Sequence, residues 1–235
     1  MLKINNLTKF YGKTFKAVDN LSLHVKAGEI YGFIGHNGAG KSTTIKSIVG
    51  AIDFEDGDIL INSTSIKENP VDCKKVMAYI PDNPDVYDYL TGIQYINFVC
   101  DIYGVKEERT ERIKEYATLF QIEKNLGDLI SSYSHGMKQK LVLISAFVHN
   151  PKLLVLDEPF VGLDPIASHR LKELMRRLCD DGGAIFFSTH VLEVAEKLCD
   201  RVGIIKGGKL VKEGSMEEIA GDKSLESLFL EIADE

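Results

Sequence analysis

Cysteine is scarce in this chain, and its cysteines form no metal-type or disulfide-type motif. The four residues, Cys73, Cys100, Cys179 and Cys199, are widely spaced and include no C-x-x-C pair. A disulfide framework or a zinc site would need closer or paired spacing. We therefore expect buried, reduced thiols in a cytosolic protein.

Long apolar runs and an excess of basic residues are also missing. No apolar stretch approaches the roughly 18 residues that a membrane-spanning helix needs. The opening residues, Met1 to Asn6, are polar and strand-like, so we expect no signal peptide. A net charge of −7 argues against nucleic acid as the main partner. The remaining composition, 44% hydrophobic and 27% charged over 235 residues, is that of a soluble globular protein, so any membrane role requires a partner.

The stretch from Gly35 to Ser42 reads GHNGAGKS and fits the phosphate-loop pattern. An apolar strand pattern at 30–34 precedes it, and a helical pattern at 43–49 follows. In this context backbone N–H groups surround a phosphate, Lys41 neutralises the β- and γ-phosphates, and the Ser42 hydroxyl ligates Mg²⁺. The nucleotide-binding residues predicted in the loop are Gly35, Asn37, Gly38, Ala39, Gly40, Lys41, Ser42 and Thr43.

A second nucleotide motif follows the apolar run 153–156. Asp157 and Glu158 come directly after this run, at the end of a predicted buried strand. A carboxylate at that position can hold Mg²⁺ beside the phosphate loop, which is the role we assign to Asp157. Glu158 is then the candidate general base that polarises the attacking water. The alternative is an acidic strand end that only caps the next turn.

Apolar periodicity predicts the remaining elements. Leu2 and Ile4 indicate an edge strand, alternation at 21–25 indicates a second strand, and 9–12 reads as a loop with an aromatic tip. Everything ahead of the phosphate loop is therefore predicted to be β-rich and antiparallel. Further strands are predicted at 58–62, 77–80, 153–156, 184–187, 202–205 and 209–211, and helices at 136–149, 171–178 and 191–198.

These elements predict an α/β fold, with a core interrupted by a helical insertion. We expect the core and an N-terminal antiparallel β subdomain over 1–86 and 150–214, a helical subdomain over 87–149, and a short helical tail over 215–235.

Four weaker motifs accompany the two nucleotide motifs. They are Ser132–Gln139 (SYSHGMKQ), with Ser134 as a helix N-cap, Gly162–Pro165 (GLDP), Ser188–His190 (STH), and Tyr11. Together with the phosphate loop (Walker A) and the Asp157–Glu158 motif (Walker B), their order resembles that of the ATP-binding-cassette (ABC) ATPases over nearly the whole chain. The resemblance implies a P-loop NTPase core of the ABC type, with ATP and Mg²⁺ as cofactors.

The resemblance also implies a role for each matching residue. Tyr11 would stack on adenine, and His190 would contact the γ-phosphate and hold the water and Glu158 in register. Ser134 and Gly136 would contact the γ-phosphate of ATP held by the other protomer, because an anion is favoured at the N-terminus of a helix. Such a dimer closes around ATP and opens after hydrolysis.

The chain departs from the family pattern at a few positions. The family's signature is usually Leu-Ser-Gly-Gly-Gln, and the segment 133–137 resembles a divergent copy of it. Tyr133 and His135 replace the usual leucine and first glycine, and the glutamine is shifted from position 137 to Gln139. The largest departure is Asp82, where the family has the Q-loop glutamine. We assign Asp82 as a third Mg²⁺ ligand, since a carboxylate near phosphates finds its nearest positive partner in Mg²⁺.

The resemblance points to the ATPase subunit of a membrane transporter, peripheral on the cytoplasmic face and paired with a second ATPase subunit. The segment 79–82 and the short tail look more like exporters than importers. An iron–sulfur assembly ATPase of similar size is the open alternative. A phosphotransferase built on the same loop would leave the signature and His190 without a role.

Overall fold

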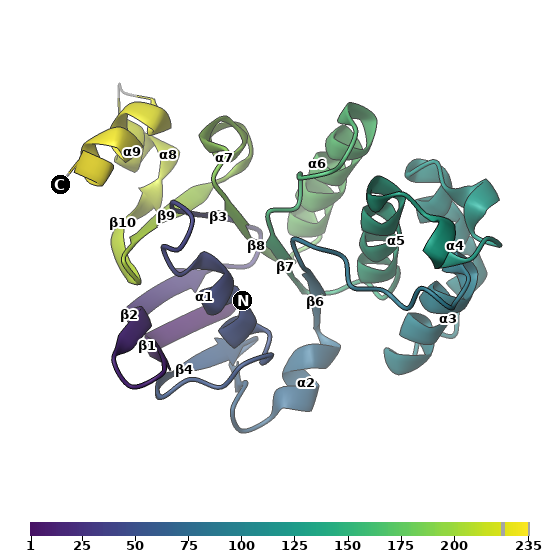
Figure 1. Cartoon of the computed structure of the whole chain (residues 1–235), viewed down its shortest axis with the longest axis horizontal. Helices are drawn as coiled ribbons and strands as arrows, with labels where there is room; N and C mark the ends of the chain where they lie inside the picture. Colours follow the sequence, from purple (N-terminus) through teal and green to yellow (C-terminus); the bar gives the residue numbers. More distant parts are fainter. Residues whose placement is uncertain (222–223, 235) are drawn as a thin grey trace.

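Two β-sheets with helices around them make up the computed structural model, which describes residues 1–221 and 224–234 (Figure 1). The larger sheet has six strands in the order β10-β9-β3-β8-β7-β6. Neighbouring strands run parallel from β6 to β9, and β10 runs antiparallel to β9. Its strands are β3 (Ile30–Ile34), β6 (Met77–Ile80), β7 (Leu153–Asp157), β8 (Ala184–Thr189), β9 (Arg201–Lys206) and β10 (Lys209–Ser215). The predicted α/β class is confirmed.

The larger sheet divides the core in two because successive side chains of a strand point to opposite faces. In β7, Leu154 and Leu156 pack into a cluster with the helices, while Leu153 and Val155 pack into a second cluster with the smaller sheet. Every residue of β3, β7 and β8 is buried. Continuous apolar runs are what a parallel sheet covered on both faces requires.

The smaller sheet is antiparallel, in the order β2-β1-β4-β5. It consists of β1 (Leu2–Tyr11), β2 (Phe15–Val25), β4 (Asp56–Ile61) and β5 (Thr64–Ser65). The expectation of an edge strand at Leu2 and Ile4 is wrong, because β1 pairs with β2 on one side and with β4 on the other. The second partner comes from beyond the phosphate loop, so local sequence did not reveal it.

Two further expectations about the N-terminal region need correction. Lys9, Phe10 and Tyr11 do not form a loop, because β1 continues through Tyr11, which pairs with Phe15 across a tight turn. The region ahead of the phosphate loop is also not wholly antiparallel, since β3 pairs in parallel with β8 and β9. In both cases the pairing between strands, and not the local sequence pattern, determined the structure.

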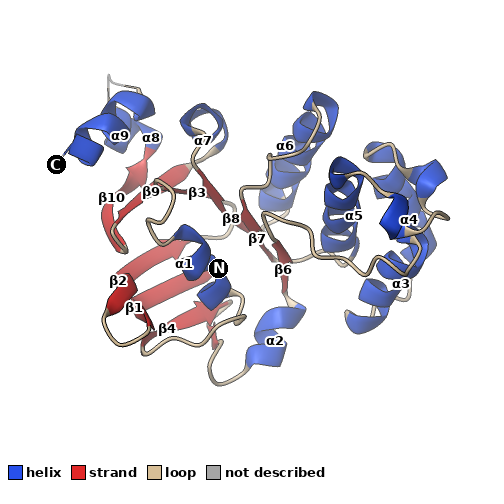
Figure 2. Ribbon diagram, viewed as in Figure 1, coloured by secondary structure: helices blue, strands red, loops and turns tan. Residues whose placement is uncertain are grey.

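Helices flank the sheets, as the ribbon coloured by secondary structure shows (Figure 2). They are α1 (Lys41–Ile48), α2 (Pro70–Lys75), α3 (Gly92–Ile102), α4 (Arg109–Leu119), α5 (His135–Val148), α6 (Pro165–Asp180), α7 (Leu192–Leu198), α8 (Met216–Ala220) and α9 (Leu225–Asp234), with 3-10 turns at Glu123–Asn125 and Ile130–Ser132. Ser134 caps α5 as predicted, accepting a hydrogen bond from Met137 N. Helices α3, α4 and α5 fall within 87–149, and the treatment of this segment as a subdomain stays a prediction.

The tail and the thiols agree with expectation where they are described. Helices α8 and α9 lie in the predicted tail 215–235, of which residues 222, 223 and 235 are outside the described part of the chain. All four cysteines are free and buried. Among the described residues, no helix combines the length and apolar character that crossing a bilayer would require.

The parallel strands bring the predicted site residues to one edge of the larger sheet. Ile34 at the end of β3 pairs with Thr189 at the end of β8, and Asp157 at the end of β7 pairs with Ser188. Ligands of open α/β sheets bind at the carboxyl ends of the strands. The segments that follow these strands therefore meet, although they are far apart in the sequence.

Candidate active site

The phosphate loop connects β3 to α1 through a tight glycine turn. Gly38 and Gly40 have φ angles of 80° and 113°, in the left-handed region that a side chain disfavours. Gly40 is the N-cap of α1 and supplies no side-chain hydrogen bond. The first N–H groups of α1 are thus free of any side-chain cap, as a phosphate-binding helix terminus requires.

Close packing against the rest of the core also requires glycine in this loop. A Cβ on Gly40 would lie 2.5 Å from the Ala17 carbonyl oxygen, and a Cβ on Gly35 would lie 2.7 Å from the Ile205 carbonyl oxygen. These oxygens belong to backbone and cannot rotate away. The phosphate loop therefore packs closely between β2 and β9.

Lys41 is 6% exposed and points back over the loop. Its ammonium donates to the carbonyl oxygens of Gly35 at 2.7 Å and His36 at 3.4 Å. The same nitrogen lies 3.7 Å from Oε1 of Glu158. The cation thus lies between the loop and the carboxylate, where the phosphates of a nucleotide would need a positive partner.

Asp157 is 4% exposed at the end of β7. Its Oδ1 accepts a hydrogen bond of 2.5 Å from the Ser188 hydroxyl, and that hydroxyl also accepts one of 3.1 Å from Glu158 N. Ser188 therefore fixes both acidic residues. The sequence motifs give a role to His190 and none to Ser188, because they do not show that Ser188 lies opposite Asp157 in the neighbouring strand.

Glu158 adopts φ 48°, which is uncommon for a residue with a side chain. Such strained positions cluster at functional sites, where the surroundings hold them. Its Oε1 lies 2.9 Å from Nδ1 of His190, and its Oε2 accepts a bond of 3.4 Å from His190 N. The carboxylate is thereby oriented between Lys41 and His190, a geometry that fits the predicted base.

These residues surround one pocket of about 300 Å³. It is lined by Tyr11, Phe15, Ala17, His36, Asn37, Gly38, Gly40, Lys41, Ser42, Thr43, Asp82, Asp157 and Glu158. Of the other predicted residues, Gly35 and Ala39 lie in the same loop, and His190 reaches the pocket through Glu158. Residues from β1, the phosphate loop, the Asp82 segment and β7 are thus brought together. Phe15 also lines the pocket and belongs to none of the sequence motifs.

The donor set of this pocket suits Mg²⁺ bound together with a nucleotide. Ser42, Asp157 and Asp82 offer a hydroxyl and two carboxylates. Mg²⁺ prefers oxygen ligands, and in nucleotide sites it takes few from protein and the rest from phosphate and water. The described residues contain no group of three His, Cys, Asp or Glu arranged to hold a metal alone. The pocket therefore fits Mg²⁺ that arrives with phosphate.

Ser134 and Gly136 lie outside this pocket, at the N-terminus of α5. A Cβ on Gly136 would lie 3.1 Å from the Gly162 carbonyl oxygen, and the Gly162 position abuts the His135 ring. Lys140 of α5 pairs with Asp164 at 2.6 Å, and their hydrogen bond lowers the pKa of Asp164. The signature thus packs on the GLDP segment, away from this chain's own phosphate loop.

Tyr133, the residue that replaces the family's leucine, anchors the signature. It is 6% exposed, and its hydroxyl donates to the Asn125 carbonyl oxygen at 2.6 Å. A Cβ at Gly92 would lie 2.3 Å from this hydroxyl. The departure is therefore accommodated by a glycine on α3 and a carbonyl on the 3-10 turn.

Asp82 is exposed and lines the nucleotide pocket. Burial raises the pKa of Tyr79 to about 12, and the charges of Asp157 and Asp82 add to that shift. Both carboxylates are thus close enough to Tyr79 to act on it. The role of Asp82 as a Mg²⁺ ligand stays a prediction.

We expect Asp82→Ala to raise the Mg²⁺ concentration needed for half-maximal ATPase activity, because it removes a carboxylate ligand. Asp82→Gln should largely restore the wild-type dependence, since its amide oxygen can also ligate. Asp85→Ala, three residues along the same loop and outside the nucleotide pocket, is the matched control. Superimposable Mg²⁺ titrations of wild type and Asp82→Ala would remove Asp82 from the metal site.

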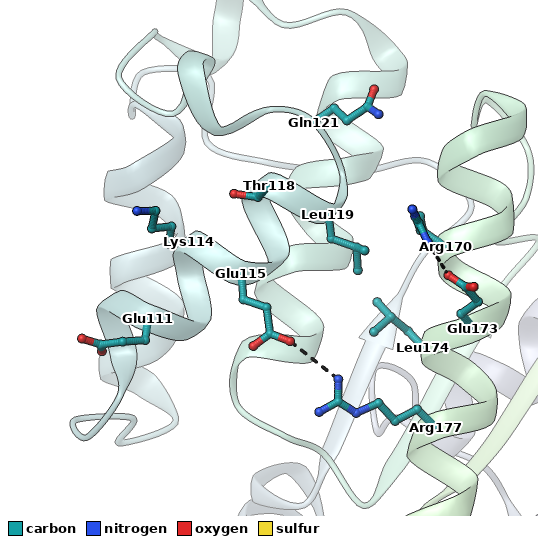
Figure 3. Close-up of a pocket in the computed structure, with 10 residues that line it drawn as sticks. All are labelled: Glu111, Lys114, Glu115, Thr118, Leu119, Gln121, Arg170, Glu173, Leu174 and Arg177. Atoms are coloured by element: carbon teal, nitrogen blue, oxygen red, sulfur yellow. Dashed lines mark hydrogen bonds and ion pairs between the residues drawn. The ribbon is translucent and has the colours of Figure 1, made fainter.

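A larger groove, of about 770 Å³, lies between α4 and α6 and not at the nucleotide site (Figure 3). Figure 3 shows Leu119 and Leu174 facing each other across it, with Glu115 and Arg177 joined at one end. That ion pair spans 3.6 Å and both side chains are more than half exposed, so it stabilises little. The groove contains none of the residues predicted to bind phosphate.

A glycine phosphate loop, a buried aspartate with its neighbouring glutamate, and a histidine at the edge of a parallel sheet define a P-loop ATPase. The profile of the family described as ABC transporter matches residues 18–161. This chain belongs to that family, as an ATP-binding subunit that uses ATP and Mg²⁺.

Similarity to known proteins extends over the whole chain. EcsA of Bacillus subtilis, an ABC-type transporter ATP-binding protein, is 35% identical over 241 residues, covering 100% of this chain and 97% of EcsA. BcrA of Bacillus licheniformis, a bacitracin transport ATP-binding protein, is 37% identical over 214 residues, covering 91% of this chain and 69% of BcrA. A solved structure of an ATP-binding subunit of an ABC transporter superposes with a TM-score of 0.95 at 34% identity, covering 99% of both chains.

Proposed function

We propose that this chain is the ATP-hydrolysing motor of a membrane exporter, and that two ATPase subunits close around ATP to drive it. The observation that supports this most is the end-to-end similarity to EcsA, a transporter ATP-binding protein. The exporter direction rests on BcrA, whose name assigns it to transport of bacitracin, an antibiotic. The bound ATP, and with it the chain, would lie on the cytoplasmic face.

The position of the signature supports a dimer. Ser134 and Gly136 are not among the residues that line this chain's nucleotide pocket. The 14-residue helix α5 begins directly after Ser134, which is exposed. A helix N-terminus attracts an anion. The anion that fits is the γ-phosphate of ATP held by a second subunit, so each site is complete after pairing.

An aromatic face formed by Tyr87, Tyr89, Tyr95 and Phe98 supports a membrane partner. Tyr87 lies 5.8 Å from Tyr89, 6.2 Å from Tyr95 and 5.8 Å from Phe98, measured between ring centroids. Tyr89 is 75% exposed, and Phe98 is 43% exposed. Exposed aromatic clusters mark interaction sites. The face begins a few residues after Asp82, so a partner bound there would be close to the nucleotide pocket.

Acidic residues beside the aromatic face favour a partner with a basic residue. Asp82, Asp85 and Asp88 are all exposed. Asp88 already forms an ion pair with Lys138 of α5 at 2.7 Å, so its carboxylate is less available to a basic residue of a partner protein. Asp85 lies outside the nucleotide pocket, so it is the residue we assign to steering a basic partner segment.

Capture of the tagged chain from detergent-solubilised membranes tests the proposal. We expect a polytopic membrane protein to co-purify, and the double variant Tyr87→Ser/Tyr89→Ser to lose it while its basal ATPase activity stays unchanged. Val211→Ser, on β10 and 45% exposed, is the control and should retain the partner. Asp85→Lys should weaken capture more at low salt than at high salt.

Two outcomes would count against this function. Capture of soluble iron–sulfur assembly proteins in place of a membrane protein would favour the alternative ATPase. Equal capture of the membrane partner by wild type and by the Tyr87→Ser/Tyr89→Ser variant would show that another surface binds it.

A further inference from the structure

Two aromatic rings, not one, face the nucleotide pocket from the β1–β2 hairpin. Tyr11 and Phe15 are paired residues of these antiparallel strands, and both line the pocket that contains Lys41 and Glu158. Tyr11 is 47% exposed and Phe15 is 61% exposed. Phe15 has no part in the family motifs found in the sequence. What distinguishes Phe15 from other exposed apolar side chains is its position at the nucleotide pocket, where its ring is open to contact with a ligand.

The strand geometry directs Phe15 to the same face as the phosphate loop. Side chains two apart on a strand share a face, so Phe15 and Ala17 point the same way. Ala17 is 6% exposed and lines the same pocket as the phosphate loop. Paired residues of an antiparallel strand pair have Cβ atoms about 4.5–5.5 Å apart. The Tyr11 and Phe15 side chains therefore leave the hairpin next to each other, at one end of the pocket that both of them line.

The chemistry of the two ends of the pocket differs. The loop end carries Lys41, Ser42 and the carboxylates, which suit phosphate and Mg²⁺. Of the described lining residues, those of the hairpin end are Tyr11, Phe15 and Ala17, and the Tyr11 hydroxyl is their one polar side-chain group. Reading the edge of a base requires hydrogen-bonding groups, whereas stacking tolerates any flat ring.

We propose that Phe15 is a second base-binding residue, and that Phe15 and Tyr11 together hold the nucleotide base by contact with its flat surfaces alone. The site then accepts ATP and GTP about equally, because adenine and guanine differ at their edges and not in stacking area. Pyrimidine nucleotides bind more weakly, since their rings are smaller. This inference rests on the ATP-binding function already assigned to the pocket.

Binding measurements with three ligands test the proposal. We expect Phe15→Ala to weaken ATP and GTP binding by roughly tenfold, within the range for loss of one base–aromatic contact. Tyr11→Ala should behave alike, and Tyr11→Phe should cost little. Inorganic triphosphate, which has no base, should bind wild type and all variants equally. In the double variant Tyr11→Ala/Phe15→Ala, ATP should bind little better than inorganic triphosphate.

Two controls separate base contact from general damage. Phe98→Ala removes an exposed phenylalanine of the aromatic face and should leave all three affinities unchanged. Phe15→Trp should restore ATP binding, since it keeps a flat ring. Unchanged ATP affinity in Phe15→Ala, an equal loss for inorganic triphosphate, or a wild-type preference for ATP over GTP above tenfold would each overturn the proposal. Failure of wild type to bind any nucleotide would instead refute the ATP-binding function itself.

Discussion

Glu158→Gln is expected to bind ATP as wild type does and to lower turnover by roughly 10²–10⁴-fold, the usual contribution of general acid–base catalysis. Glutamine keeps the length and shape of the side chain, but its amide does not accept the proton of the attacking water. Phosphate release under saturating ATP measures turnover, and equilibrium binding measures affinity. The same variant should trap the ATP-bound dimer, visible as an earlier elution in gel filtration.

The structure explains why this position is sensitive. The Glu158 carboxylate lies 2.9 Å from His190 Nδ1 and 3.7 Å from Lys41 Nζ, so its orientation is set from two sides. Its backbone is strained at φ 48° and held by Ser188. Gln121 also has a positive φ, of 60°, so glutamine tolerates that backbone conformation.

Glu193→Gln provides the matched control for this variant. Glu193 lies on α7, a few residues beyond His190, and pairs with the exposed Lys197 at 2.7 Å. We expect normal turnover and no trapped dimer. A Glu158→Gln protein that hydrolyses ATP at the wild-type rate and stays monomeric with ATP would contradict the assignment.

The local sequence pattern was sufficient to predict most strands of the larger, mainly parallel sheet. Continuous apolar runs marked β6, β7 and β8, and the glycine loop between a strand and a helix marked the phosphate site. These signals act within a few residues, so they can be recognised without knowing what packs on them. The convergence of Lys41, Asp157 and Glu158 followed from one rule, that ligands bind at the carboxyl ends of parallel strands.

What sequence could not reveal depends on pairing between distant segments. β1 is an inner strand of the smaller sheet because it pairs with β4, which follows the phosphate loop in the sequence. Ser188 acts on Asp157 because the two are opposite in neighbouring strands, a register that no spacing along the chain encodes. Phe15 reaches the pocket for the same kind of reason, through its pairing with Tyr11.

Gly40→Ala is expected to abolish tight ATP binding and to destabilise the fold. The added Cβ would lie 2.5 Å from the Ala17 carbonyl oxygen and 3.1 Å from Ile205 Cδ1, and the backbone has φ 113°. Conformations of this kind cost a residue with a side chain about 1–3 kcal/mol, and the contact with a fixed carbonyl adds to that cost. The loop must therefore move away from β2, which displaces the amides that we predict to surround the phosphate. Thermal unfolding and ATP titration measure the two effects.

Gly182→Ala separates the steric contact from the backbone cost. Gly182 also has a left-handed backbone, with φ 84°, but an added Cβ there meets nothing within 4 Å. It lies in the turn between α6 and β8, outside the nucleotide pocket. We expect a loss of about 1–2 kcal/mol in stability from the left-handed backbone and no change in ATP affinity. The expectation would be contradicted if the two variants were destabilised equally and Gly40→Ala still bound ATP tightly. The loop would then accommodate the added Cβ, and its contact with Ala17 would not determine the conformation of the phosphate site.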